Sequence, residues 1–192
     1  DLAEQGLFRC LGILASLGGE AEVVYPGVDV EAYADVAAAP PGDAMFLVVG
    51  RFDPRKNLPL AIAALARLRE LDPAVFATVR LGIAGGLDPS RPEDGELAAG
   101  LVRQAAALGV GARVELVFSP TEPERLALLG RCVAVIHAAV DEHFGLVPVE
   151  AMAAARAALA RRSAGPLETI LDGETGLLRS PTPDAFAGAM RA

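Results

Sequence analysis

Two short segments of the chain carry charged residues of the types that bind phosphate and sugar. The first segment holds Arg51 and Lys56, and the second holds Glu142 and Glu150, eight positions apart. Arginine grips phosphate oxygens through a planar, two-pronged guanidinium, and lysine supplies a compact positive charge. An ionised carboxylate only accepts hydrogen bonds, which suits the vicinal hydroxyls of a ribose. Together these residue types predict a site for a nucleotide that carries a sugar.

The context of the two glutamates indicates which elements position them. An apolar stretch over Val133 to Ile136 predicts a buried strand, and an alanine-rich helical stretch follows Glu150. We therefore expect Glu142 on the loop after the strand and Glu150 in the first turns of the helix. Gly145 and Pro148 suit the helix entry, because the missing N–H of proline costs nothing there. The free N–H groups of that turn form an anion site.

The residues between the glutamates are further candidates for nucleotide binding. The backbone amides of Phe144, Gly145 and Leu146 could meet the phosphates. The Phe144 ring could equally plug the core. His143 is expected in the pocket, and both a proton-shuttle role and a scaffold role stay open for it. His137, on the predicted buried strand, is expected to be structural.

The basic segment, Gly50 to Asn57, directly follows the apolar run Met45–Val49. It is therefore expected at the carboxyl end of a strand, where parallel sheets bind ligands. A diphosphate leaving group gains negative charge as the glycosidic bond breaks, so Arg51 and Lys56 suit its stabilisation. A solvated basic loop is the alternative interpretation. Phe118-Ser119 ends another predicted strand and could border the base.

Short apolar runs alternate with helical patterns along the chain. The predicted strands are Glu22–Tyr25, Met45–Val49, Thr78–Ala84, Arg113–Phe118, Val133–His137, Ala157–Ala160 and Gly176–Arg179. Helices are predicted after Asn57 as the N-cap, over Glu96–Leu108, after a capping box at Thr121, and over Thr182–Arg191. This alternation predicts an α/β fold with a Rossmann-like, doubly wound parallel sheet.

Composition excludes several classes of protein. A chain of 192 residues fits one domain over 1–192, and its formal net charge of −8 disfavours generic nucleic-acid binding. Cys10 and Cys132 have no metal or redox spacing, and two histidines are too few for a metal cluster. The sequence lacks an Asp-x-Asp motif, a signal peptide and an apolar run of about 20 residues. We expect no cofactor and no required metal.

Three ordered motifs resemble glycosyltransferase family 4, the retaining enzymes of the GT-B fold. They are Gly50–Leu58 (GRFDPRKNL), Asp141–Met152 (DEHFGLVPVEAM) and Gly165–Ile170 (GPLETI). The resemblance runs from about Val24 to the C-terminus. Within the family it is strongest to the alpha-1,3/1,6-mannosyltransferases of the dolichol-linked oligosaccharide pathway, which makes N-glycan precursors.

The resemblance implies the C-terminal, donor-binding half of a GT-B fold. Residues 1–22 are then expected to be the remnant of a connection from an absent acceptor half, and the fragment alone is expected to bind without turnover. The implied donor is GDP-mannose, and the implied acceptor is a dolichol-linked oligosaccharide bound through the missing half. The implied location is the cytosolic face of the endoplasmic reticulum membrane, reached through segments outside this chain.

The resemblance also implies roles for the matching residues. Arg51 and Lys56 correspond to the positions that bind the donor diphosphate, and Glu150 to the one that binds the ribose. Glu142 corresponds to the carboxylate near the donor sugar and the reacting centre. Glu142, Arg51 and Lys56 are thus the catalytic candidates.

The chain departs from the family pattern at two places. Ala164 stands where the family's Gly-Gly-Pro-Leu-Glu loop has its first glycine, and Ala155-Arg156-Ala157 stands where the family usually has Gly-x-Pro. If position 164 requires a positive φ, its alanine is strained. These departures keep open a non-catalytic nucleotide-binding module. A family 4 transferase that uses a UDP- or ADP-sugar is the other alternative, whereas the missing G-x-G-x-x-G fingerprint disfavours a dehydrogenase.

Overall fold

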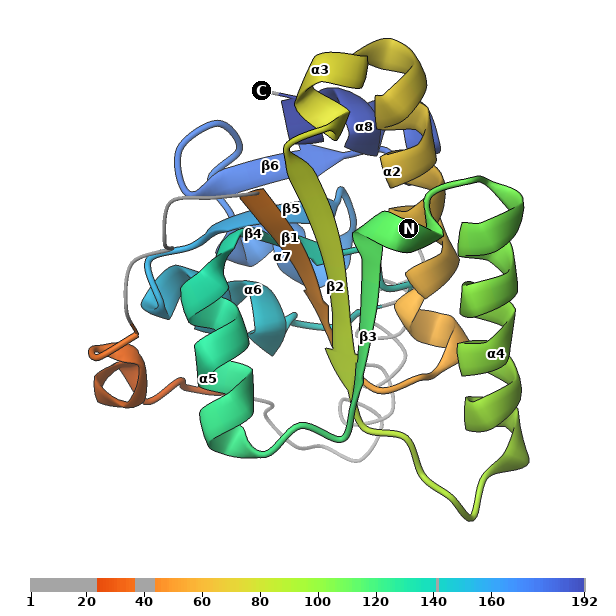
Figure 1. The fold of residues 1–192 in the computed structure, drawn as a ribbon. Coiled ribbons are helices and arrows are strands. Elements are labelled where there is room, and N and C mark those ends of the chain that lie inside the picture. Colours follow the sequence, from red (N-terminus) through yellow and green to blue (C-terminus); the bar gives the residue numbers. More distant parts are fainter. Residues whose placement is uncertain (1–23, 37–43, 141, 192) are drawn as a thin grey trace, which may run out of the picture.

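The structure is a computed structural model that describes residues 24–36, 44–140 and 142–191. Within these residues the chain forms one parallel sheet of six strands in the order β3-β2-β1-β4-β5-β6 (Figure 1). The strands are β1 (Ala44–Val49), β2 (Val79–Gly85), β3 (Val114–Phe118), β4 (Cys132–His137), β5 (Ala157–Arg161) and β6 (Gly176–Arg179). The predicted α/β, doubly wound parallel sheet is confirmed.

Helices cover both faces of this sheet, as Figure 1 shows for α4 and α5 on opposite sides. One face carries α2 (Leu58–Leu71), α3 (Pro73–Phe76), α4 (Pro92–Ala107) and α8 (Pro183–Arg191). The other face carries α5 (Glu122–Arg131) and α6 (Leu146–Ala153). The remaining helical segments are η1 (Val30–Tyr33), η2 (Pro54–Lys56), η3 (Gly111–Arg113) and α7 (Ala164–Thr169).

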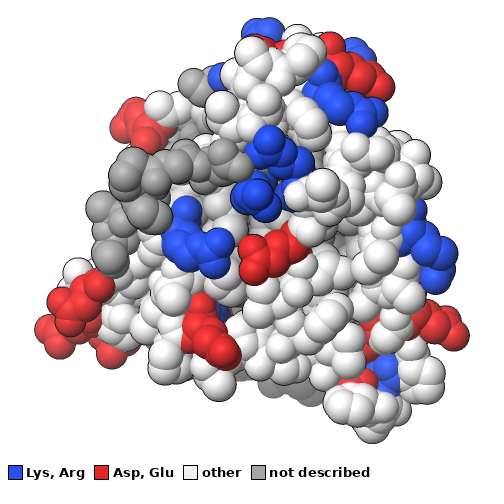
Figure 2. All heavy atoms as spheres, in the orientation of Figure 1, with Lys and Arg blue, Asp and Glu red and all other residues white. Residues whose placement is uncertain are grey.

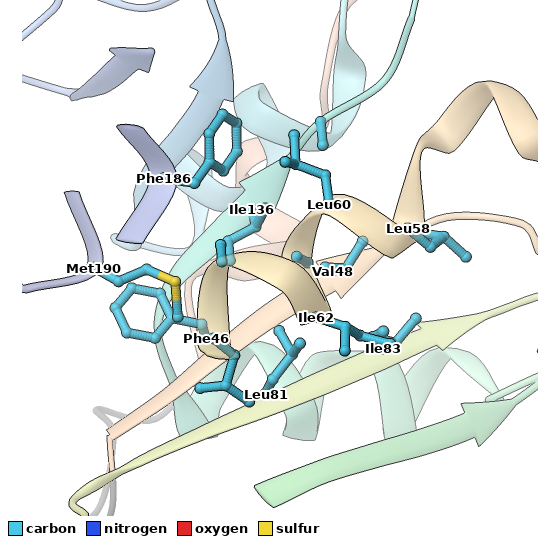
Figure 3. Close-up of a cluster of buried hydrophobic side chains, with 14 of the residues drawn as sticks. Phe46, Val48, Leu58, Leu60, Ile62, Leu81, Ile83, Ile136, Phe186 and Met190 are labelled. Atoms are coloured by element: carbon cyan, nitrogen blue, oxygen red, sulfur yellow. The ribbon is translucent and has the colours of Figure 1, made fainter. Parts of the chain in front are cut away.

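The central strand β1 is buried on both faces, because successive side chains of a strand point to opposite sides. Phe46 and Val48 pack into a cluster with α2 and α8 (Figure 3). Met45 and Leu47 pack into a second cluster with α5 and α6. The two clusters fix β1 and β4 between helical layers, so the loops at the carboxyl ends of these strands start from rigid points.

Most predicted elements lie within one or two residues of their predicted bounds. The capping box is confirmed, since the Thr121 N–H donates to a Glu124 carboxylate oxygen at 2.7 Å. The helix predicted from Glu96 starts four residues earlier, at Pro92. The predicted strand Glu22–Tyr25 is wrong in its described part, because residues 24 and 25 form no strand, and its first two residues lie outside the described chain.

The predicted N-cap at Asn57 is confirmed in position but not in a side-chain capping hydrogen bond. Asn57 precedes α2, but its φ is 49° and its side chain makes no capping hydrogen bond. Its left-handed backbone instead closes η2, with its N–H donating to the Pro54 carbonyl at 3.1 Å. Asparagine tolerates this conformation better than most residues. The residue thus turns the chain sharply out of the basic segment and into α2.

The surface shows charged side chains of both signs. On the face drawn in Figure 2, acidic and basic groups are interspersed, and neither sign forms a continuous field.

Among the described residues, no helix is long and apolar enough to cross a membrane. The same part of the chain holds no group of three or more His, Cys, Asp or Glu side chains arranged for a metal ion. Cys132 is a buried free thiol, and Cys10 lies outside the described residues.

Candidate functional site

The basic segment and the loop with Glu142 meet at the centre of the sheet. Strand β1 has β2 on one side and β4 on the other, so the strand order reverses between β1 and β4. Open α/β sheets bind ligands in the crevice at the carboxyl ends of such strands. Residues 50–57 leave β1 at this edge, and residues 138–140 leave β4 beside them. The Val140 N–H joins the two loops by donating to the Arg55 carbonyl at 2.7 Å.

Lys56 and Glu142 form an ion pair across these loops. The Lys56 ammonium lies 2.8 Å from Glu142 Oε2, and the two side chains are only 26% and 22% exposed. The nearby His137 ring and the Lys56 ammonium hold the pKa of Glu142 at about 2, well below its ordinary value of 4.5. Glu142 is therefore ionised throughout the physiological range, and it cannot serve as a general acid near neutral pH.

His137 lies closer to this pair than the sequence indicated. It ends β4, is only 3% exposed, and places Nε2 3.5 Å from Glu142 Oε2. That distance is at the outer limit of a hydrogen bond, and Nε2 has no well-formed hydrogen bond to any described group. The expectation of a purely structural residue missed this contact. Its position as the last residue of a strand, at the ligand-binding edge, was the available signal.

Arg51 faces an open hollow at the carboxyl ends of β1, β2 and β3. Its side chain is 63% exposed and lies 3.9 Å from the Asp53 carboxylate. It lines a hollow of about 370 Å³ together with Ser119 and Arg125. Ser119, which was expected to border a base, thus lies at this edge. By contrast, Arg55 binds both oxygens of the buried Asp53, and this contact holds the pKa of Asp53 far below its usual range.

Glu150 lies on the first turns of α6, and its carboxylate is held by a residue that the sequence did not single out. Arg125 Nη1 donates to Glu150 Oε2 at 3.0 Å. Arg125 also binds the Glu122 carboxylate and the Tyr33 hydroxyl. In the sequence, Arg125 follows Glu122 by three positions, which is the pattern of an ordinary surface pair on a helix. Nothing in the sequence alone relates it to Glu150 or Tyr33.

The residues before α6 take the positions expected of a helix entry. Gly145 has a φ of 84° and directly precedes Leu146, the first residue of α6, whose side chain is 40% exposed. His143 is exposed at the loop surface. The Phe144 ring is half-buried and lies 5.5 Å from the Tyr25 ring, centroid to centroid. It belongs to neither of the two large hydrophobic clusters, so the core-plug interpretation is wrong.

A close backbone approach fixes the loop of Glu142. A Cβ added to Gly165 would lie 2.4 Å from the Phe144 backbone, so only glycine fits between α7 and this loop. The Gly165 N–H also donates to the Glu142 carbonyl at 3.3 Å. The start of α7 therefore supports the backbone that carries Glu142.

Both departures from the family pattern lie where the backbone favours glycine. Ala164, at the start of α7, has a φ of 24°, and Ala155, after α6, has a φ of 53°. Positive φ is unfavourable for a residue with a Cβ. Position 164 therefore has a positive φ, so its alanine is strained, and the same strain applies to Ala155. Among the described residues, neither alanine forms a hydrogen bond with Lys56 or Glu142, so the strain concerns the loops around the site.

The comparisons with known proteins agree with this geometry. The profile of the family described as "Glycosyl transferases group 1" matches residues 29–192. The alpha-1,3/1,6-mannosyltransferase of Mus musculus is 33% identical over 178 residues, covering 88% of this chain and 43% of the relative. A D-inositol 3-phosphate glycosyltransferase of Nocardiopsis dassonvillei is 35% identical over 182 residues, covering 90% of this chain and 42% of the relative. The chain thus spans less than half the length of these relatives.

Solved structures of related proteins share the fold. Sucrose-phosphate synthase from Thermosynechococcus elongatus superposes with a TM-score of 0.74 at 28% identity, over 90% of this chain and 43% of that chain. The C-terminal domain of a glycosyl transferase group 1 family protein from Francisella tularensis superposes with a TM-score of 0.71 at 22% identity, over 86% of both chains. The chain belongs to the group 1 glycosyltransferases, family 4, and it is the C-terminal, nucleotide-sugar-binding half of their GT-B fold.

Proposed function

We propose that this domain binds GDP-mannose and serves a retaining mannosyltransferase that acts on a lipid-linked oligosaccharide. The observation that carries the site is the Lys56–Glu142 pair at the reversal of strand order, with Arg51 of the same basic segment lining a hollow at the carboxyl ends of β1 and β2. The choice of mannose is supported by the 33% identity to alpha-1,3/1,6-mannosyltransferases. The 35% identity to D-inositol 3-phosphate glycosyltransferases keeps a different donor sugar as the second candidate.

In this proposal the donor diphosphate lies between the basic segment and the start of α6. Arg51 binds it with its two-pronged guanidinium, and Lys56 adds a point charge. An ammonium has three donors, so Lys56 retains Glu142 while it also meets a phosphate oxygen. The backbone amides at the start of α6 supply further donors, and Glu150 accepts from the ribose hydroxyls.

The proposed reaction is a front-face displacement. The bond between the anomeric carbon and the diphosphate oxygen breaks, and a bond from the acceptor oxygen forms on the same face. The departing diphosphate takes the proton of the acceptor hydroxyl, while Arg51 and Lys56 stabilise its growing charge. Glu142, held ionised by its neighbours, is proposed to face the donor sugar and the positive charge that develops at the anomeric carbon. Every step uses groups of the chain and the two substrates.

The acceptor side of the reaction is proposed to belong to residues outside this chain. A preceding acceptor half would hold the dolichol-linked oligosaccharide, and segments outside this chain would associate with the cytosolic face of the endoplasmic reticulum membrane. Residues 1–22 would then connect the two halves. On its own, the 192-residue chain is proposed to bind donor without turnover.

Transfer assays with the longer protein test the proposal, with GDP-mannose compared against UDP- and ADP-sugars. Arg51→Ala is expected to lower kcat/KM by about 100- to 1,000-fold, the usual effect of removing one donor that stabilises a developing negative charge. Glu150→Ala is expected mainly to raise KM for the donor. Arg103→Ala, an exposed arginine on α4 away from this edge, is the matched control. Near-normal activity in both site variants would overturn the assignment, and a preference for another nucleotide would select the second candidate.

A further inference from the structure

We infer that Arg125 is a positioning residue for Glu150, and that Tyr33 in η1 holds Arg125 in that role. The inference rests on the proposed function, in which Glu150 accepts hydrogen bonds from the ribose. It adds a residue on a different helix, α5, and a residue from the segment that leads into the sheet. The carboxylate that binds the ribose would then be positioned by residues of three separate elements, α6, α5 and η1.

The Arg125 guanidinium is fixed on every nitrogen. Nη1 donates to Glu150 Oε2 at 3.0 Å, and Nη2 donates to the Tyr33 hydroxyl at 2.9 Å. Nε and Nη2 also donate to the two oxygens of Glu122, at 2.8 and 2.7 Å. The side chain is only 17% exposed. A planar guanidinium bound in three directions has one orientation, so it presents Nη1 to Glu150 at a defined point.

Tyr33 anchors this arrangement from the other side. It is 6% exposed and packs in the hydrophobic cluster that includes Ala151 and Ala154 of the α6 region. Its ring centroid lies 5.5 Å from the central carbon of the Arg125 guanidinium, within the range of a cation–π contact. Burial raises the pKa of Tyr33, so its hydroxyl stays neutral and accepts from Arg125. A buried ring thus determines where the guanidinium lies.

Glu150 needs such a partner because of its own position. Its side chain is 25% exposed and lies at the edge of an open site, where a glutamate without partners samples several rotamers. Hydrogen bonding to a vicinal diol requires the carboxylate in one place. Arg125 also lines the hollow that Arg51 borders, so the network connects the ribose carboxylate to the phosphate-binding edge. The Arg125 nitrogens donate to Glu150, Glu122 and Tyr33, so the loss of Arg125 would weaken contacts to the ribose hydroxyls and leave those to the base and phosphates in place.

Paired titrations with GDP and 2′,3′-dideoxy-GDP test this inference, because only GDP carries the ribose diol. For Glu150→Gln and Arg125→Gln we expect Kd for GDP to rise about tenfold, as for the loss of a hydrogen bond to a charged group. Kd for dideoxy-GDP is expected to stay within about twofold of wild type in both variants. Tyr33→Phe is expected to show a smaller loss with the same dependence on the diol. Arg131→Gln, on the same helix with a side chain 51% exposed, is the control.

The outcomes separate the inference from the proposal beneath it. Equal weakening of both nucleotides by Arg125→Gln, with folding intact by circular dichroism, would mean that Arg125 acts on the phosphates or on the domain as a whole, and would overturn the inference. A diol-dependent loss in Glu150→Gln that is absent from Arg125→Gln would also overturn it, while the ribose role of Glu150 would stand. The absence of any diol dependence in Glu150→Gln would refute the proposed ribose role itself.

Discussion

Ala155 offers a substitution in which the structure predicts a gain of stability. Its N–H donates to the Met152 carbonyl at 3.0 Å, and the Arg156 N–H donates to the Ala151 carbonyl at 2.8 Å. These two bonds form a Schellman motif at the end of α6, in which the residue at position 155 is usually glycine. With a φ of 53°, alanine at this position bears a cost of about 1–2 kcal/mol for the left-handed backbone.

Ala155→Gly should therefore raise the free energy of unfolding. Glycine removes that cost but loses about 0.4–1 kcal/mol through the greater freedom of the unfolded chain, which leaves a net gain of about 1 kcal/mol. For a domain of this size the gain corresponds to a rise in Tm of about 2–4 °C. Ala155 is exposed, so no packing is lost.

Urea unfolding followed by circular dichroism measures the effect. The control is Ala127→Gly, because Ala127 is exposed in the interior of α5, where glycine costs about 1 kcal/mol relative to alanine. The same substitution is thus expected to have opposite signs at the two positions. A loss of stability at both positions would refute the reasoning from backbone conformation.

Three further predictions follow from the same structure. Ala164 has a φ of 24°, so Ala164→Gly should raise the free energy of unfolding by about 0.5–1 kcal/mol and shift the midpoint of urea unfolding to a higher concentration. A lower midpoint would show that this backbone is not strained. Gly165→Ala should lower the unfolding free energy by about 1–3 kcal/mol, because the added Cβ meets the Phe144 backbone at 2.4 Å, and unchanged stability in thermal melts would contradict the close approach. The folded-state pKa of Glu142, about 2, lies below its ordinary 4.5, so its stabilisation is present in full above pH 4.5 and is lost as pH falls toward 2. Between pH 6 and pH 3, wild type should therefore lose about 2 kcal/mol more stability than Glu142→Gln, and equal losses would count against the ion pair.

The sequence predicted the fold well because the strong local signals agreed with the tertiary structure. Continuous apolar runs such as Met45–Val49 are typical of parallel strands covered by helices on both sides, and the side chains of this run are buried on both faces of the sheet. The same logic placed the basic segment and Glu142 at strand ends, and the structure brings Lys56 and Glu142 into contact from 86 positions apart. The incorrect strand prediction at Glu22–Tyr25 shows where this reasoning stops, because residues 24 and 25 form no strand. A short apolar run does not by itself indicate whether a neighbouring strand is available to pair with it.

The parts of the site that sequence reasoning missed depend on contacts between distant elements. The sequence predicts that Arg125 forms an ordinary i,i+3 surface pair with Glu122. In the structure it also binds Glu150 and Tyr33, which are 25 and 92 positions away. His137 reads as one more residue of a buried strand, yet its position at the strand end brings its ring to Glu142. A local sequence pattern predicts which face of a helix or strand is buried and where the element ends. It does not predict which side chains of distant elements come into contact, because those contacts depend on how the helical layers pack against the sheet.

A donor site at the carboxyl ends of β1 and β4 can be tested by calorimetric titration of the 192-residue chain with GDP, UDP and GDP-mannose, with Arg51→Ala and Arg103→Ala in parallel. We expect saturable binding of GDP and GDP-mannose that is tighter than that of UDP, is lost in Arg51→Ala, and is retained in Arg103→Ala. Binding that is insensitive to Arg51, or no binding of any nucleotide by the folded chain, would contradict a donor site at the carboxyl ends of β1 and β4.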